Sequence, residues 1–181
     1  MPERPLPRIL LVDDEPHVLS ALQRLLRREL AGTAQVEAHT SPQAALARAL
    51  EVPFALVVSD YRMPELDGLA FLKAFSELQP RARRLMLSGV TDFDVLVSAV
   101  NDVGLDRYLI KPWDDQEMAG ALAAALAEQA RNEEARRLAD ERRGELGQLS
   151  AEDLERRRLE AEEPGITQVR RGPDGAVHLD D

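Results

Sequence analysis

The feature that most constrains the fold is an alternation of short apolar runs with amphipathic helical segments between Arg8 and Trp113. Several runs are apolar throughout, as in strands that are covered on both faces of a sheet. Repeated strand–helix units predict an α/β fold in which helices wind doubly around a five-stranded parallel sheet. Strands are expected at 9–12, 36–39, 55–59, 84–87 and 107–110, and helices between them at 18–30, 44–50, 68–78 and 91–101.

The composition narrows the classes of function. The 181 residues carry a formal net charge of -10, and an acidic surface repels nucleic-acid phosphates, which argues against direct nucleic-acid binding. The absence of cysteine excludes disulfides, thiolate metal sites and a catalytic thiol. The first residues do not resemble a signal peptide, and no apolar stretch approaches the roughly 20 residues that span a bilayer. We therefore expect a cytoplasmic protein without membrane contact.

A long helical extension is expected after Trp113. Residues 115–145 are rich in Ala, Arg, Glu and Leu, and a helix of this length would exceed about 40 Å, too long for the last helix of a compact domain. A shorter helix is expected from Ser150 to Glu163. Residues 164–181 are either a β-hairpin around Gly172–Gly175 or a frayed acidic tail. The predicted organisation is an α/β domain over residues 1–125, a helical extension over 126–163, and a hairpin or tail over 164–181.

The extension has two alternative interpretations. An exposed helix of this length needs a partner, which favours a coiled-coil homodimer through Asp115–Glu145. The apolar positions follow one helical stripe only intermittently, and Arg142 and Glu145 interrupt a strict heptad. A single amphipathic helix folded back on its own domain is the alternative.

Polar residues stand at the expected carboxyl ends of four strands: Asp13 and Asp14, Asp60, Ser88, and Lys111. In an open α/β sheet, functional groups lie at this edge. If the first and third strands are neighbours, the three carboxylates converge. Their mutual repulsion then calls for a cation, and hard oxygen ligands favour Mg²⁺.

The same set of residues suits phosphoryl chemistry. A carboxylate beside such a metal can attack phosphorus and form an aspartyl phosphate. Lys111 and Ser88 fit the cation and the hydroxyl donor that an incoming phosphoryl group requires. Taken singly, each residue is more often a helix cap, a loop residue or a solvated charge. Their order and their positions at successive strand ends favour the functional interpretation.

Four segments contain most of these residues: Ile9–Glu15, Val58–Gly68, Leu87–Gly89 and Tyr108–Pro112. They resemble the motifs of two-component response regulator receiver domains of the chemotaxis-regulator type. The resemblance covers about residues 8–125 and is followed by the helical extension. Its most specific part is the Asp-x-x-Met-Pro-x-x-Asp-Gly stretch that begins at Asp60. The resemblance implies a flavodoxin-like sheet of strand order 2-1-3-4-5.

The resemblance implies a role for each matching residue. Asp60 would be the phosphoacceptor, and Asp13, Asp14, Asp60 and the backbone carbonyl of Arg62 would hold Mg²⁺. Ser88 would hydrogen-bond the phosphoryl group.

Lys111 would form an ion pair with that group and would precede a cis peptide bond to Pro112. Tyr108 would be the aromatic switch that turns inward when Ser88 moves. These roles describe a signalling switch rather than an enzyme.

The sequence is compatible with three functions to different degrees. The leading one is a response regulator that receives its phosphoryl group from a histidine kinase or phosphotransfer protein and changes a protein-interaction surface. The alternative is the regulatory receiver of a larger enzyme, such as a cyclic-dinucleotide phosphodiesterase or a phosphatase, because Lys111–Asp114 is similar to receivers fused to such enzymes. A phosphate hydrolase is disfavoured, because Asp13-Asp14-Glu15 does not match the Asp-x-Asp pattern expected on its first strand.

Overall fold

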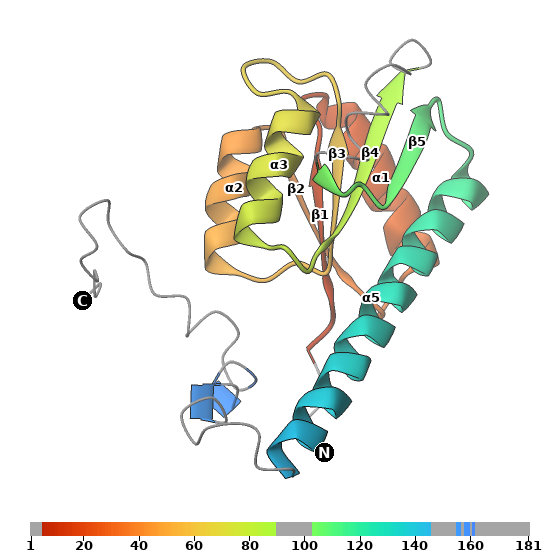
Figure 1. Ribbon diagram of the computed structural model, residues 1–181. Helices are drawn as coiled ribbons and strands as arrows, with labels where there is room; N and C mark the ends of the chain where they lie inside the picture. The colour runs from red at the N-terminus through yellow and green to blue at the C-terminus, as the bar shows by residue number, and fades with distance from the viewer. Residues whose placement is uncertain (1–4, 90–102, 146–154, 157, 160, 162–181) are drawn as a thin grey trace, which may run out of the picture. The chain divides into compact units, whose positions relative to one another are not determined.

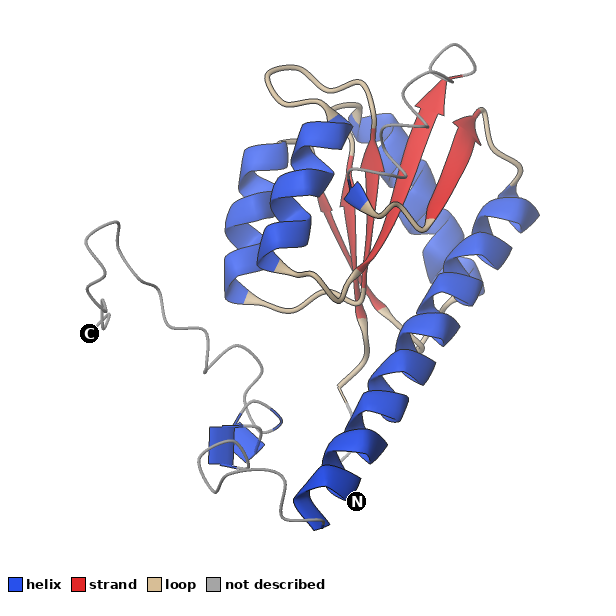
Figure 2. Cartoon of the chain, in the orientation of Figure 1, coloured by secondary structure: helices blue, strands red, loops and turns tan. Residues whose placement is uncertain are grey.

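A computed structural model describes residues 5–89 and 103–145, together with 155, 156, 158, 159 and 161. Five parallel strands form one sheet in the order β2-β1-β3-β4-β5, as the resemblance to receiver domains implied (Figure 1). Helices α2 and α3 cover one face of the sheet, and α1 and α5 cover the other (Figure 2). The strands are β1 (Arg8–Val12), β2 (Gln35–His39), β3 (Leu56–Asp60), β4 (Arg83–Gly89) and β5 (Arg107–Lys111); the helices are α1 (Pro16–Glu29), α2 (Pro42–Glu51), α3 (Gly68–Leu78) and α5 (Asp115–Glu145).

The apolar strands divide their side chains between two cores, because successive residues of a strand point to opposite faces. In β1, Ile9 and Leu11 pack with α1 and α5, whereas Leu10 and Val12 pack with α2 and α3. All five residues of β3 are buried, which explains its continuous apolar pattern. This burial is consistent with the position of β3 at the centre of the sheet, where helices cover both faces.

Local sequence signals set the helix starts. The Ser41 side chain accepts a hydrogen bond from the amide of Ala44, and Pro42 opens α2. Asp67 caps α3 in the same way through Ala70, and Asp114 accepts from the amides of Gln116 and Glu117 at the start of α5. These caps place each helix directly after a strand or loop of the carboxyl edge.

The chain divides into two compact units, residues 1–133 and 134–181. Within the second unit, Arg137 forms ion pairs with Glu134 and Glu141 along the helix. The expected helix at 91–101 and the hairpin or tail at 164–181 lie outside the described residues, as does most of the helix expected after Ser150. Across the described ranges, no helix is long and apolar enough to cross a membrane.

Candidate functional site

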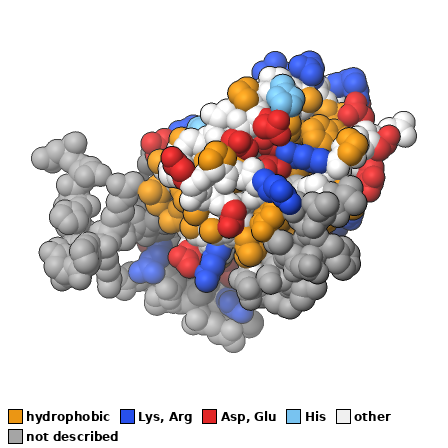
Figure 3. All heavy atoms as spheres, turned by 90° about the horizontal axis from the view of Figure 1, so that it is seen from above, with side chains coloured by type: hydrophobic (Ala, Val, Ile, Leu, Met, Phe, Trp, Pro, Cys, Tyr) orange, Lys and Arg blue, Asp and Glu red, His pale blue; other side chains and the backbone are white. Residues whose placement is uncertain are grey.

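The parallel register brings two predicted acidic residues side by side. Val12 pairs with Ser59 across β1 and β3, so the next residues, Asp13 and Asp60, emerge together at the carboxyl edge. Both are buried, with 1% and 5% of their surface exposed. Figure 3 looks onto this edge and shows acidic side chains gathered beside basic ones near its centre. The burial of two neighbouring carboxylates is unfavourable unless a cation lies close by.

Lys111 supplies that positive charge. It pairs with Gly89 at the end of β4, and the peptide bond to Pro112 is cis, as the resemblance implied. Its Nζ lies 2.7 Å from Oδ2 of Asp13 and 2.5 Å from Oδ1 of Asp60. The ammonium group therefore bridges the two carboxylates, although it lies 98 residues from Asp13 in the chain.

The environment shifts the pKa values of two of these groups. Burial raises the pKa of Asp60, while hydrogen bonding to Lys111 and to the backbone of Arg62 acts in the opposite direction. Burial tends to lower the pKa of Lys111, but its bonds to Asp13 and Asp60 outweigh this effect and raise it. Lys111 is therefore charged at neutral pH.

The other predicted residues lie around this centre and differ in how far they are exposed to solvent. Ser88 is buried near the end of β4, and its hydroxyl donates to the backbone carbonyl of Gly89 at 3.4 Å. Asp14 is half-buried, and the side chain of Arg62 is exposed. Within the described ranges, no three His, Cys, Asp or Glu side chains are arranged to hold a metal. Of the three carboxylates that were expected to converge, Asp13 and Asp60 both contact Lys111, which lies between them.

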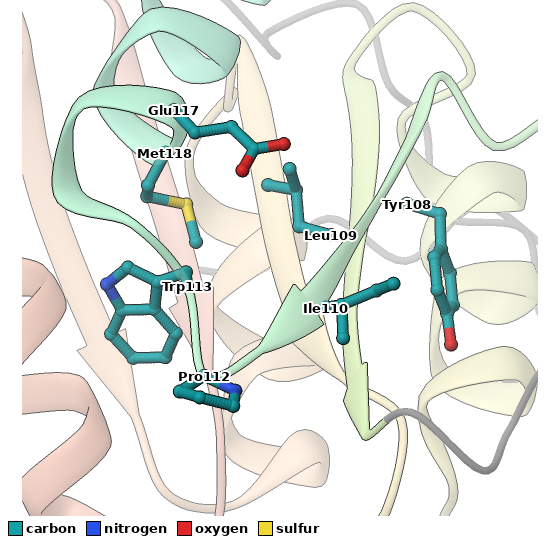
Figure 4. A pocket seen from close by; sticks show the side chains of 7 residues that line it. All are labelled: Tyr108, Leu109, Ile110, Pro112, Trp113, Glu117 and Met118. Carbon is teal, nitrogen blue, oxygen red and sulfur yellow. The ribbon is translucent and has the colours of Figure 1, made fainter.

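Tyr108 lies apart from the carboxylates, on the edge strand β5. It helps to line a pocket of about 200 Å³ beside the first turn of α5 (Figure 4). Ile110 shares this pocket and is half exposed, while Trp113 is half-buried on the α5 side. The pocket is formed by Tyr108, Leu109, Ile110, Pro112, Trp113, Glu117 and Met118.

The sequence interpretation missed a close backbone contact beneath the site. A Cβ added to Gly68 would lie 2.1 Å from the carbonyl oxygen of Asp60, so only glycine fits there. The Gly68 amide donates to the carbonyl of Tyr61 at 2.8 Å. The motif Asp67-Gly68 hinted at this position, but the approach itself depends on how α3 returns to the end of β3.

A second feature that the sequence did not reveal is an ionic connection at the opposite edge of the sheet. Arg83 forms an ion pair with Asp106, which lies just before β5, and another with Glu128 of α5 at 2.7 Å. Asp106 also accepts a hydrogen bond from the amide of Arg84 at 2.8 Å. Since these residues are distant in sequence and charged, no periodic signal marks them.

Comparison with known proteins identifies the family. The family model for the response regulator receiver domain matches residues 9–123. The chain is 37% identical over 105 residues to the hydrogenase transcriptional regulatory protein HoxA of Cupriavidus necator, covering 58% of this chain and 21% of that protein. It is 34% identical over 148 residues to the transcriptional regulatory protein FixJ of Azorhizobium caulinodans, covering 80% and 68% respectively. Three other matches span between 24% and 34% of the relatives' lengths.

Solved structures agree with the sequence relatives. The receiver domain of an HD domain-containing protein from Pseudomonas fluorescens superimposes with a TM-score of 0.65 at 33% identity, covering 70% of this chain and 98% of that one. A CheY-like receiver domain protein from Methanospirillum hungatei gives a TM-score of 0.64 at 26% identity, covering 71% and 99%. The strand order, the residues at the carboxyl edge and these matches lead to one conclusion: the chain belongs to the response regulator receiver domain family of two-component signalling.

Proposed function

We propose that this receiver accepts a phosphoryl group on Asp60 from the phosphohistidine of a histidine kinase or phosphotransfer protein. The observation that carries the proposal is the pair of buried carboxylates, Asp13 and Asp60, bridged by Lys111. A carboxylate oxygen of Asp60 would attack phosphorus, the phosphorus–nitrogen bond would break, and its electron pair would remain on the imidazole nitrogen. The product would be an aspartyl phosphate, which makes the protein a signalling switch rather than an enzyme.

Lys111 and Ser88 would stabilise that product. Lys111 is a compact cation already within 3 Å of both carboxylates, so it can follow the added negative charge with little movement. Ser88 lies on the neighbouring strand β4, one residue after Leu87, which pairs with Asp60. Its buried hydroxyl would donate to a phosphoryl oxygen.

The donor chemistry of the site fits Mg²⁺. Asp13, Asp14, Asp60 and the backbone carbonyl of Arg62 supply only hard oxygen ligands, and they would hold the ion. The bound ion would supply charge neutralisation for the phosphoryl oxygens. Lys111 would remain in contact with Asp60.

Output would pass from the site to a protein-interaction surface. An added phosphoryl group carries nearly two negative charges and three acceptor oxygens, which would draw the hydroxyl of Ser88 toward it. Tyr108 would move into the space that Ser88 leaves and would reshape the pocket beside α5. The downstream partner would be a protein that binds this reshaped surface, and a homodimer through Asp115–Glu145 would carry the signal between two copies.

A specific likeness favours a second candidate, the regulatory receiver of a larger enzyme. The similar structure from Pseudomonas fluorescens is the receiver of an HD domain-containing protein, and another, from Rhodopirellula baltica, is described as an adenylate cyclase. In that case the shared switch chemistry would control a catalytic domain. Both candidates require phosphorylation of Asp60.

Intact-mass measurement after incubation with a small phosphodonor and Mg²⁺ tests the shared proposal. The protein should gain one phosphoryl group, Asp60→Asn should gain none, and chelation of Mg²⁺ should prevent labelling. Lys111→Ala should leave Mg²⁺ binding largely intact and shorten the life of the phosphorylated state. Labelling of Asp60→Asn to the same extent as the parent protein would refute the assignment.

A further inference from the structure

We infer that Ser59 is a positioning residue for phosphoryl transfer, because its buried hydroxyl holds the peptide group that follows Asp60. The inference rests on the proposed function, since it concerns how Asp60 is aimed. Ser59 has no exposed surface and donates from Oγ to the carbonyl oxygen of Asp60 at 2.9 Å.

A hydroxyl at this position is unexpected on packing grounds. The other strand residues before Asp60 are Leu56, Val57 and Val58, and all are buried and apolar. By alternation, Ser59 faces the same side as Val57, toward α2 and α3. A polar group in such a setting is unfavourable unless it is hydrogen-bonded. The bond to the Asp60 carbonyl satisfies it and gives the hydroxyl a definite orientation.

The peptide group between Asp60 and Tyr61 is held at both ends. At its carbonyl end lie the Ser59 hydroxyl and the bare Cα of Gly68, where a Cβ would approach the same oxygen to 2.1 Å. At its amide end, the Tyr61 N–H donates to the carbonyl of Leu87 in β4 at 2.8 Å. Rotation of this peptide plane would change ψ of Asp60 and move the chain relative to its carboxylate.

Among these constraints, Ser59 is the one that a side chain contributes. The Tyr61–Leu87 bond is between backbone groups, and Gly68 acts by having no side chain. Because misplacement of a reacting group by about 1 Å can reduce a rate up to about 100-fold, loss of the Ser59 hydroxyl should affect transfer as well as stability. The expected effect is a reduction of roughly tenfold in the phosphorylation rate of the folded protein.

The test compares two substitutions of nearly equal size in the full chain. Ser59→Thr keeps a hydroxyl, whereas Ser59→Val replaces it with a methyl group, so any crowding by the extra carbon is shared. Phosphorylation with acetyl phosphate and Mg²⁺ is followed by intact mass, and the maximal rate is separated from the half-saturating phosphodonor concentration. Rates are taken where both variants are fully folded by circular dichroism.

We expect Ser59→Val to lower the maximal rate roughly tenfold relative to Ser59→Thr, with little change in half-saturation. Hydrogen exchange over residues 59–68 should be faster in Ser59→Val. The control is Ser76→Ala, which removes a comparable hydroxyl-to-carbonyl bond to Lys73 in α3 and should leave the rate unchanged.

Equal maximal rates for the threonine and valine variants would overturn the inference, whatever their stabilities. A wild-type protein that takes up no phosphoryl group would instead refute the proposed function. These two failures are distinguishable, because the first requires normal labelling of the wild type.

Discussion

Gly68 shows how a single residue type is dictated by its surroundings rather than by its own backbone angle. Its Cα lies against the carbonyl of Asp60, at the point where α3 begins. Any side chain must push the start of α3 away from the end of β3. The position of the Asp60 backbone beside α3 therefore requires a residue without a side chain at Gly68.

We predict that Gly68→Ala destabilises the protein by about 2–4 kcal/mol, because the new methyl group overlaps backbone that cannot easily move. Urea denaturation measures this change. The matched control is Gly120→Ala in α5, where an added Cβ meets nothing within 4 Å. That substitution should stabilise the protein by about 0.5–1 kcal/mol through helix propensity. A similar effect of both substitutions would contradict the steric explanation.

Asp60 itself should make stability depend on pH. Burial raises the pKa of Asp60 above its ordinary value of 3.8, even though Lys111 opposes the shift. Below pH 3.8 the residue is protonated in both the folded and unfolded states. As pH rises through the raised folded-state pKa, ionisation costs the folded state more, and this contribution to stability is lost.

Asp60→Asn removes that ionisation, so we expect it to be more stable than the parent protein near pH 7. The gain should shrink toward zero as the pH falls to about 4. Urea unfolding at a series of pH values from 4 to 8 measures the difference. A gain that is constant across this range would show that ionisation of Asp60 is not its cause.

At the scale of elements, Gln79 connects α3 to the loop between α2 and β3. Its Nε2 donates to the carbonyls of Ala49 and Val52, each at 2.7 Å, and its Oε1 accepts from the amide of Phe54 at 2.7 Å. One side chain thus satisfies backbone groups at the end of one helix and before the next strand. The long separation in sequence hides this role.

We predict that Gln79→Ala lowers the free energy of unfolding by about 1–3 kcal/mol, because three partly buried backbone groups lose their partners. Gln79→Glu should cost at least as much at neutral pH, since a carboxylate oxygen would face two carbonyl oxygens. Denaturant titration measures both. Gln43→Ala is the control, because the two side-chain bonds of Gln43, to Ser41 and to Glu65, are both exposed, and it should change stability by about 0.5 kcal/mol or less. Wild-type stability for Gln79→Ala would refute the role.

Helix α5 changes character along its length. Its buried residues recur at helical spacing up to Gln129, whereas the described residues that follow, through Arg143, are exposed or half-buried. Leu138 is a large apolar residue with 52% of its surface exposed. The exposed ion pairs of Arg137 with Glu134 and Glu141 support the helix locally.

For the whole molecule, we predict that two copies associate through the helix Asp115–Glu145, and that its exposed part beyond Glu133 is required. A helix with an exposed leucine and little apolar surface of its own is stabilised by a partner of the same kind. Sedimentation equilibrium should find the full chain as a dimer and a chain ending at Glu133 as a monomer. Monomers in both samples would refute the coiled-coil interpretation and leave the local ion pairs as the support for the helix.

The sequence alone determined the fold class and the residues at the carboxyl edge. Apolar runs such as Leu56–Val58 mark strands directly, because burial on both faces leaves little choice of side chain. The caps Ser41, Asp67 and Asp114 mark helix starts through bonds that span only two or three residues. Strand ends were less predictable: β4 extends over Arg83–Gly89, beyond the apolar run at 84–87, because ladder pairing involves the backbone rather than the side chain.

Only the tertiary structure decided how the distant groups meet. Lys111 could be expected near Asp60, but its simultaneous contact with Asp13 depends on the register of four strands, β1, β3, β4 and β5. The bridges made by Gln79 and Arg83, and the contact of Gly68 with Asp60, likewise join segments that no local pattern relates. Short-range signals specify elements because their energetics are local, whereas these contacts arise only once packing has placed the elements side by side.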